Sequence, residues 1–133
     1  MSYAILRVPD GLPHADIVDL DVATDGVLWV ATAENGVARF DGTSWKSYAL
    51  KDGLPYLNGL SIHAADNGNV YAGVYMPNYA NSGGGLSRFD GVSWTSTQYA
   101  ALYYDARNFV NDITTDSGGT VWTACGGKLA SVV

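Results

Sequence analysis

The tetrapeptide DGLP at residues 10–13 recurs as DGLP at residues 52–55, and this recurrence decides the fold. The two copies are offset by 42 residues, and the same offset aligns Trp29 with Tyr71. A period in this range is typical of repeat proteins in which each repeat is one supersecondary unit. The sequence is therefore built from internal repeats.

A second recurrence extends the pattern toward the C-terminus. FDGTSW at residues 40–45 returns as FDGVSW at residues 89–94, with an offset of 49 residues. This offset is seven residues longer than the first, which places an insertion within residues 74–85. A third copy is recognised by Val110, Ile113, Gly119 and Trp122, which repeat the spacing of Ile17, Leu20, Gly26 and Trp29.

Each copy consists of short β-branched and aromatic segments separated by Asp-Gly, Asn-Gly or Gly-Gly turn signals. In the first copy these segments are residues 17–23, 27–32, 37–41 and 44–50, and we name the four positions strands A, B, C and D. Strand B is nearly all apolar, which is typical of a strand covered on both faces. A repeat of about 42 residues with four antiparallel strands predicts an all-β chain of β-propeller blades.

The composition excludes several other classes of protein. The chain has 133 residues, 47% of them hydrophobic and 15% charged, so it can bury a core and is not a disordered polar chain. Its net charge of −6 and its seven scattered Lys and Arg residues predict no nucleic-acid partner. No apolar run has the roughly 20 residues that a membrane-spanning helix needs, and no signal peptide is recognisable, so we expect no membrane association.

The order of these motifs resembles the two-component regulator propeller repeat, found in the sensor regions of bacterial hybrid histidine kinases. The resemblance rests on DGLP, on LWV at residues 28–30 and on RFDG at residues 39–42, and it covers essentially the whole chain. Copy two has Tyr71 in place of the strand B tryptophan, and copy three lacks DGLP. The resemblance implies propeller blades. It also implies that relatives are typically periplasmic, whereas Met1 as a native start would indicate the cytoplasm.

The repeat boundaries divide residues 1–133 into a single propeller unit: a head strand at 2–8, a first blade at 10–50, a second at 52–100, and strands A to C of a third at 108–133. The head aligns with strand D, so it can complete a three-stranded C-terminal blade. Propellers usually contain about four to eight blades. We therefore expect self-assembly into a homodimer with six blades, with a homotrimer of nine blades as an alternative; a fragment of a larger sensor propeller is the other interpretation.

Positions that recur in every copy are expected to be scaffold, and unrepeated features are better candidates for a site. Trp29, Tyr71 and Trp122, together with Trp45 and Trp94, are interpreted as packing between blades. The acidic turns, such as Asp25-Gly26, lack the clustered carboxylates of a calcium loop and predict Asx turns instead. We expect no metal and no cofactor.

The residues offer little for catalysis, so we predict that the chain is not an enzyme. His14 and His63 are the only histidines and Cys125 is the only thiol. We interpret His14 as a solvated loop residue, His63 as a packed or hydrogen-bonded strand residue that could line the channel, and Cys125 as a small apolar residue.

The unrepeated residues converge on one face, because the D-to-A and B-to-C connections of a propeller emerge on the same side. Five tyrosines lie in these loops, and tyrosine offers an apolar ring for stacking and a hydroxyl for hydrogen bonding. The predicted ligand contacts are Tyr56, Tyr75, Asn78, Tyr79, Tyr103, Tyr104 and Arg107. The alternative is that the inserted loop only packs over its neighbour.

The sequence thus predicts a non-enzymatic binding or scaffold module, an oligomeric β-propeller that recognises a small polar ligand or glycan on its loop face. The alternative is a purely structural or protein-interaction propeller.

Overall fold

The computed structural model describes residues 2, 4–12, 14, 16–75, 84–97, 109–125 and 128–132. In this part of the chain, eleven strands form three antiparallel sheets. The first sheet contains β1 (Ile17–Val22), β2 (Leu28–Thr32), β3 (Val37–Phe40) and β4 (Trp45–Tyr48). The second contains β5 (Asn58–Ala64), β6 (Val70–Tyr75), β7 (Gly84–Phe89) and β8 (Trp94–Thr97), and the third contains β9 (Val110–Thr115), β10 (Val121–Cys125) and β11 (Lys128–Val132). Two short 3₁₀ helices, η1 (Val8–Asp10) and η2 (Leu50–Asp52), precede β1 and β5.

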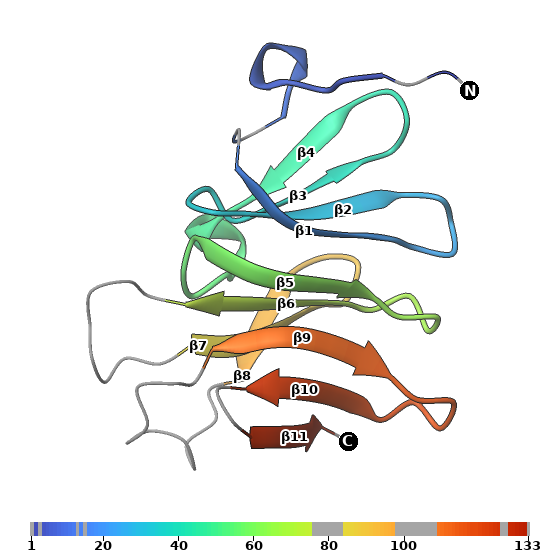
Figure 1. Ribbon diagram of the computed structural model, residues 1–133, viewed down its shortest axis with the longest axis vertical. Coiled ribbons are helices and arrows are strands. Elements are labelled where there is room, and N and C mark those ends of the chain that lie inside the picture. The colour runs from blue at the N-terminus through green and yellow to red at the C-terminus, as the bar shows by residue number, and fades with distance from the viewer. Residues whose placement is uncertain are drawn as a thin grey trace.

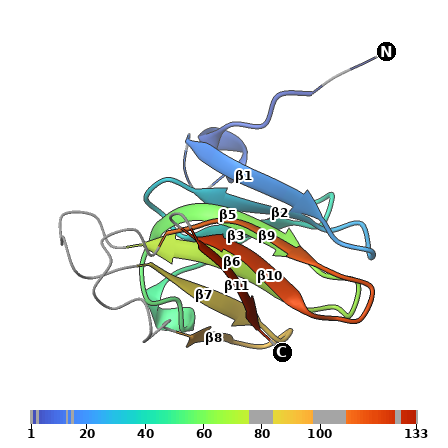
Figure 2. The same cartoon turned by 60° about the horizontal axis from the view of Figure 1, so that its bottom comes forward.

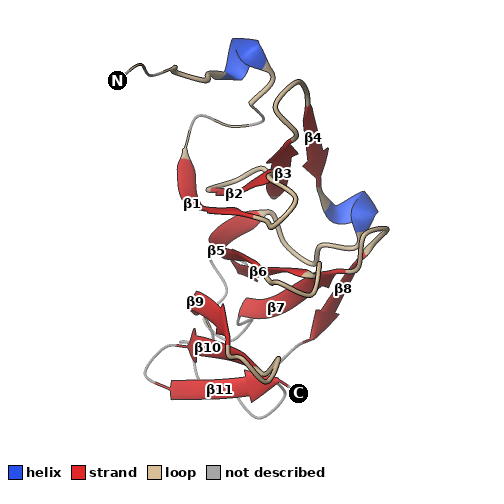
Figure 3. Ribbon diagram, turned by 90° about the vertical axis from the view of Figure 1, so that its right-hand side faces the viewer, coloured by secondary structure: helices blue, strands red, loops and turns tan. Residues whose placement is uncertain are grey.

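The sheets have the blade topology that the repeats predict. In each sheet the spatial order of the strands is their order along the chain, β1 to β4, β5 to β8 and β9 to β11. The three sheets stack face to face in a row (Figure 1), and the same layering is visible from the tilted view of Figure 2. The first strands, β1, β5 and β9, follow one another along one edge of the stack (Figure 3). The chain is all-β and consists of propeller-type blades.

Each first strand carries an irregularity at the same place in the repeat. The ladder register shifts between Ile17 and Asp19 in β1, between Gly59 and Ser61 in β5, and opposite Val110 and Asp112 in β9. A bulge of this kind bends a strand and increases its twist. Its recurrence shows that the three blades are shaped alike at the edge formed by β1, β5 and β9, which we call the inner edge.

The expected strand limits are wrong at two places. Strand D of the first copy was expected to reach residue 50, but β4 ends at Tyr48 because Leu50–Asp52 forms η2. There the Asp52 carboxylate accepts the Ala49 N–H at 2.8 Å, which closes the turn. Similarly, the head strand was expected over residues 2–8, but Val8 belongs to η1 and residues 4–7 have no strand pairing within this chain. Pairing of the head with another copy stays a prediction.

The DGLP segments are connectors that anchor the next blade. Both end a 3₁₀ helix with a glycine in the left-handed region, Gly11 at φ 103° and Gly53 at φ 101°. Only glycine adopts such a conformation without steric cost. The leucine that follows each glycine, Leu12 or Leu54, is buried. The motif therefore sets the path from strand D of one blade to strand A of the next.

The core lies between blades, where aromatic rings from neighbouring sheets meet. Trp29 and Tyr48 of the first sheet stack at 5.7 Å, and both pack against Phe89 and Trp94 of the second sheet at 5.0–6.2 Å between ring centroids. A second apolar cluster, which includes Val110, joins the second and third sheets. Packing of this kind between sheets, rather than within one sheet, holds the blades together.

The scaffold interpretation of the repeated aromatic residues is confirmed where two blades meet. Trp29, Tyr71 and Trp94 are buried in the clusters between blades. Trp45 and Trp122, on the two outer sheets, are only partly buried. The same repeat position is therefore buried or half-exposed according to whether a described blade covers it.

Candidate functional site

Alternate side chains of a first strand point to opposite faces of its sheet, so β5 contacts both the first and the third blade. In β1, Asp19 and Asp21 face the second sheet, where the Asp19 carboxylate accepts the Ile62 N–H at 3.0 Å and the Asp21 carboxylate accepts the Ala64 N–H at 2.8 Å. Their other oxygens accept N–H groups of β1 itself. Carboxylates therefore link the inner edges of the first two blades through charge-assisted hydrogen bonds.

His63 is placed by β5 in the middle of the row of first strands and contacts both neighbouring blades. Its Nδ1 atom lies 3.3 Å from the Asp21 carboxylate on β1, and its Nε2 atom lies 2.8 Å from the hydroxyl of Thr115 on β9. The side chain is 20% exposed. The expectation of a packed or hydrogen-bonded histidine is confirmed, and the partners belong to different blades.

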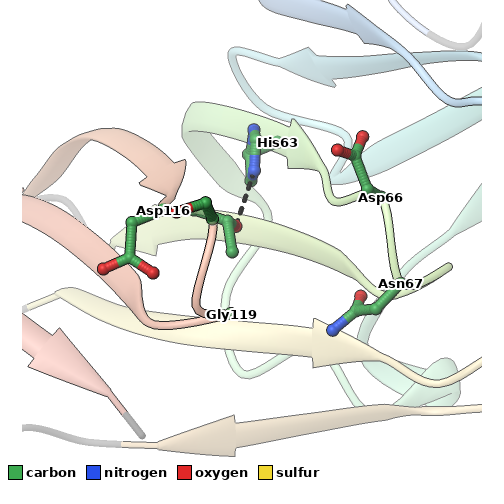
Figure 4. A pocket seen from close by; sticks show the side chains of 7 residues that line it. His63, Asp66, Asn67, Asp116 and Gly119 are labelled. Carbon is green, nitrogen blue, oxygen red and sulfur yellow. Dashed lines mark hydrogen bonds between the residues drawn. The ribbon is translucent and has the colours of Figure 1, made fainter.

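A cavity opens beside His63, between the turn that joins β5 to β6 and the turn that joins β9 to β10. Its volume is about 240 Å³. The lining residues are mostly polar: His63, Asp66, Asn67, Thr115, Asp116, Ser117 and Gly119. Figure 4 shows His63 between Asp116 of the third blade and Asp66 and Asn67 of the second. The cavity is thus shared by two blades.

The Asp116 turn forms one wall of the cavity, and its ionised carboxylate is directed away from His63 (Figure 4). The pKa of the Asp116 carboxyl is lowered, chiefly because the Trp122 indole N–H donates to it at 2.9 Å. The backbone N–H groups of Thr120 and Gly118 also donate to this carboxylate, at 3.0 Å and 2.9 Å. Hydrogen bonds to the ionised form favour that form, so Asp116 is a carboxylate at neutral pH.

The order of carboxylate, imidazole and hydroxyl in this row is the order that serine hydrolases use. Such catalysis also needs hydrogen-bond donors aimed at the developing oxyanion. Beside Thr115, the N–H groups of Gly118 and Thr120 and the indole of Trp122 already donate to the carboxylate of Asp116. These donors are thus engaged with a resident anion, and the described contacts of His63 form a bridge between blades.

Of the predicted loop-face residues, the structure describes Tyr56 and Tyr75. Tyr56 is half-buried against the core between the first two sheets. Tyr75 ends β6, pairs with Asn58 in the ladder, and packs edge-on against Phe109 at 5.1 Å. Both tyrosines thus lie at the same end of the second blade, and both have packing partners. The other five predicted contacts, Asn78, Tyr79, Tyr103, Tyr104 and Arg107, lie outside the described residues.

The interpretations of the turns and of Cys125 are confirmed. Asp25, Asn67 and Asp116 each accept a backbone N–H two residues ahead, which is the Asx turn that the sequence predicts. Cys125 is a buried free thiol packed in the second core cluster. Over the residues that the structure covers, no group of three or more potential metal ligands is present, and no helix is long and apolar enough to cross a membrane.

The cavity itself was not found by sequence reasoning. Its residues come from two turns that are about 50 positions apart in the chain, and each turn by itself reads as an ordinary hairpin. The available signal was that His63 occupies a strand A position held by Asp21 in copy one and Thr114 in copy three. An unrepeated residue at a repeated position marks a candidate site in a repeat protein.

No protein-family model and no curated protein sequence matches the chain. Solved structures do. The extracellular domain of a putative hybrid two component system from B. thetaiotaomicron has a TM-score of 0.72 and 17% identity, over 95% of this chain and 17% of that chain. The extracellular domain of a putative one component system from the same organism has a TM-score of 0.68 and 19% identity, over 89% of this chain and 15% of that chain. Virginiamycin B lyase from Staphylococcus aureus has a TM-score of 0.66 and 15% identity, over 89% of this chain and 38% of that chain.

These likenesses establish the fold. The chain spans less than a fifth of the length of the two extracellular domains. Their similarity is consistent with the resemblance to two-component regulator propeller repeats, which is confirmed at the level of the blade fold. At these identities the likeness extends to the arrangement of strands.

Proposed function

We propose that the chain is a non-enzymatic binding module of β-propeller blades, and that it recognises a small polar ligand such as a glycan. The observation that carries this proposal is the polar cavity between the second and third blades. Its volume of about 240 Å³ is smaller than the roughly 300–1,000 Å³ of sites for drug-sized ligands. A ligand the size of one sugar ring suits it.

The lining offers the hydrogen-bonding groups that a polyhydroxylated ligand needs. The carboxylate of Asp66 is an acceptor for ligand hydroxyl groups. The side-chain oxygen of Asn67 accepts the Asn69 N–H at 3.0 Å, so the amide NH₂ of Asn67 is the group that a ligand can reach. Ser117 adds a hydroxyl that both donates and accepts. Ligands with hydroxyl donors are favoured over anions, because the cavity contains a carboxylate.

The comparisons support a binding role more than an enzymatic one. Two of the similar structures are extracellular domains of regulatory systems, which supports a sensor-type function and an extracytoplasmic location for this chain as well. The third is a lyase by name. The interpretation as part of a larger sensor propeller agrees with the small share of the two extracellular domains that the chain spans.

The test is a calorimetric and thermal-shift screen of mono- and oligosaccharides, followed by titration of Asn67→Ala with any hit. Loss of one hydrogen bond to the ligand should weaken binding by about 0.5–1.5 kcal/mol, which is roughly 2- to 13-fold. Asp25→Ala is the matched control, because Asp25 occupies the same turn position in the first blade and caps Val27 N–H at 3.0 Å outside the cavity. Both variants should lose similar stability, and only Asn67→Ala should lose affinity.

The predicted loop face lies at the end of the second blade opposite the cavity, because Tyr75 ends β6 whereas the cavity adjoins its start. It is therefore an alternative binding surface, and the same titration tests it with Tyr79→Ala and Tyr104→Ala. If these rings anchor the ligand by stacking, each substitution should weaken binding by about 1–3 kcal/mol and leave stability nearly unchanged. If the screen finds no ligand and both variants melt early, the loop is packing and the chain is a structural or protein-interaction propeller.

A further inference from the structure

The interface between the first two blades shows how two of these sheets fit together. One face of β5 packs on the first sheet, where Ile62 is 4% exposed, and its inner edge receives the carboxylates of Asp19 and Asp21. On the first sheet, the paired residues Ala31 and Val37 of β2 and β3 are fully buried under this contact. The contact between the second and third blades again packs strand A, here β9, against the preceding sheet. There the Ser61 hydroxyl donates to the Val110 carbonyl in place of the carboxylate contact.

The face of the first sheet that points away from the second sheet is uncovered, and we call it the incoming face. Val18, Leu20 and Val22 of β1 occupy the positions of Leu60, Ile62 and Ala64, one repeat of 42 residues earlier. Leu20 is 60% exposed, whereas Ile62 at the same position is 4% exposed. Three large apolar side chains in alternate positions of one strand form a surface of the kind that is normally covered.

The face of the third sheet that points away from the second sheet is also uncovered, and we call it the outgoing face. Ala124 pairs with Leu129 as Ala31 pairs with Val37, so Leu129 is the counterpart of Val37. Leu129 is 71% exposed, and Val37 is 0% exposed. A shallow groove of about 110 Å³ is lined here by Trp122, Ala124 and Leu129, among others. In Figure 2 the third sheet is turned toward the viewer, and β10 and β11 lie in front of the other sheets.

The outgoing face also carries an aspartate that corresponds to Asp19 at the interface between the first two blades. Asp112 on β9 has the repeat position of Asp19, and its Oδ1 atom accepts the Ile113 N–H at 2.9 Å, as Asp19 accepts the Leu20 N–H. The second oxygen of Asp19 holds the amide of the next blade. No described contact involves Oδ2 of Asp112, which leaves it available for an incoming first strand.

The connector before β1 is already folded as the connector before β5. Arg7 N–H donates to Asp10 at 3.0 Å in η1, as Ala49 N–H donates to Asp52 at 2.8 Å in η2. The second connector joins β5 to β4, the outer strand of the preceding sheet. By the same geometry, η1 directs residues 4–7 to the outer edge of whichever sheet precedes β1. Leu6 then takes the position of Tyr48, which is 3% exposed, while Leu6 is 41% exposed in this chain.

We propose that a second copy of this chain docks its β1 face onto the β9–β10–β11 face of the first. Leu20 of the incoming copy enters the groove beside Trp122 and Leu129. Its backbone N–H, which donates to Asp19 of its own strand, is then shared with Oδ2 of Asp112. Residues 4–7 of the incoming copy pair with the edge of β11 that has no described partner, with Leu6 opposite Leu129. The interface is a continuation of the one between the first two blades. Because the N- and C-termini mark opposite ends of the stack (Figure 1), two copies can make the contact reciprocally and close a ring of six blades.

The first measurement is the mass of the 133-residue chain by light scattering at micromolar concentration. We expect twice the chain mass of 14.1 kDa, with three times that mass as the nine-blade form of the same interface. A monomer would overturn the proposal and would indicate that further blades of a longer polypeptide cover these faces.

The second experiment uses charge substitutions on the two faces. Leu20→Asp places a charge on the incoming face of every copy, and Leu129→Asp places a charge on the outgoing face of every copy. Each variant alone should therefore be monomeric. An equimolar mixture should recover a heterodimer, because one intact interface remains between the two variants. Val92→Asp, at an 87% exposed site on neither face, should leave the mass unchanged. Two charge variants that keep the wild-type mass, or a mixture of monomers, would overturn the proposal.

A milder pair of substitutions remains informative if the charged variants do not fold. Leu6→Ser should weaken self-association at least tenfold, because Leu6 takes a buried position in the docked strand. Ile5→Ser should have little effect, because Ile5 takes the position of Ser47, which is exposed on β4. Equal effects of the two substitutions would contradict the predicted pairing with β11. The circular dichroism of each variant reports whether the blades are folded.

Discussion

At the scale of single residues, one tryptophan joins two blades. Trp29 is 4% exposed and contacts Tyr48 of its own sheet and Phe89 and Trp94 of the next. Aromatic pairs in such offset and edge-on arrangements contribute beyond the area that they bury. The blade interface therefore depends on this ring more than on any one hydrogen bond at the inner edge.

Trp29→Ala should lower the free energy of unfolding by about 3–5 kcal/mol, because it leaves a cavity between two sheets that cannot collapse onto it. Chemical denaturation measures this loss. Val92→Ala is the control, since Val92 is exposed and should change stability by less than about 0.5 kcal/mol. A loss below about 1 kcal/mol for Trp29→Ala would mean that the ring is not the centre of the interface.

At the scale of elements, the connector between blades is as specific as the strands. Gly53 ends η2 at φ 101°, and a Cβ atom there would collide with the carbonyl oxygen of Trp94. The connector thus passes directly over β8 of its own blade. A glycine is required by both the backbone conformation and the close approach.

Gly53→Ala should destabilise the protein by more than Gly26→Ala. The comparison separates the cost of the left-handed backbone conformation from the cost of the close approach to β8. Gly26 also has a positive φ of 85°, but a Cβ atom there would meet nothing within 4 Å. Gly26→Ala should cost about 1 kcal/mol, the usual cost of a left-handed alanine, and Gly53→Ala should cost 1–2 kcal/mol more, of the order of a strained backbone contact. Thermal unfolding of both variants checks the difference; equal losses would show that β8 moves away at no cost.

At the scale of the whole molecule, every blade contains an aspartate that holds a turn together. In the first two blades the pKa values of Asp41 and Asp90 are lowered, chiefly by the backbone N–H groups of Ser44 and Ser93 respectively. In the third blade the pKa of Asp116 is lowered, chiefly by the indole N–H of Trp122. A lowered pKa in the folded state stabilises the fold above the unfolded-state pKa of about 3.9, and this stabilisation is lost as the pH falls through the folded-state value.

The protein should therefore lose stability on acidification below about pH 5, and the triple variant Asp41→Asn, Asp90→Asn, Asp116→Asn should lose less of its own stability over the same range. Asparagine keeps an acceptor oxygen in each turn but binds no proton. The melting temperature measured from pH 7 to pH 3 tests this. Asp66→Asn is the control, since Asp66 makes no hydrogen bond among the described contacts. If its melting temperature depended on pH as little as that of the triple variant, the assignment to the turns would be contradicted.

The repeat structure could be predicted from the sequence because its determinants are local. DGLP, FDGxSW and the apolar strand B segment each specify a turn or a strand within a few residues, and their recurrence at a constant spacing implies stacked blades. For the same reason, the strand limits expected for the first copy were correct to within two residues, and the Asx turns were recognised from single Asp and Asn side chains. The errors fell at Leu50 and Val8, where a 3₁₀ helix competes with the strand.

Only the tertiary structure decided which residues of neighbouring blades meet. Asp21, His63 and Thr115 are 42 and 52 positions apart, and no periodicity indicates that an imidazole would bridge a carboxylate and a hydroxyl. Such contacts depend on the stacking register of whole sheets, to which every interblade side chain contributes. The exposure of Leu20 and Leu129 has the same origin, because a repeat position is buried or exposed according to whether another blade lies against it.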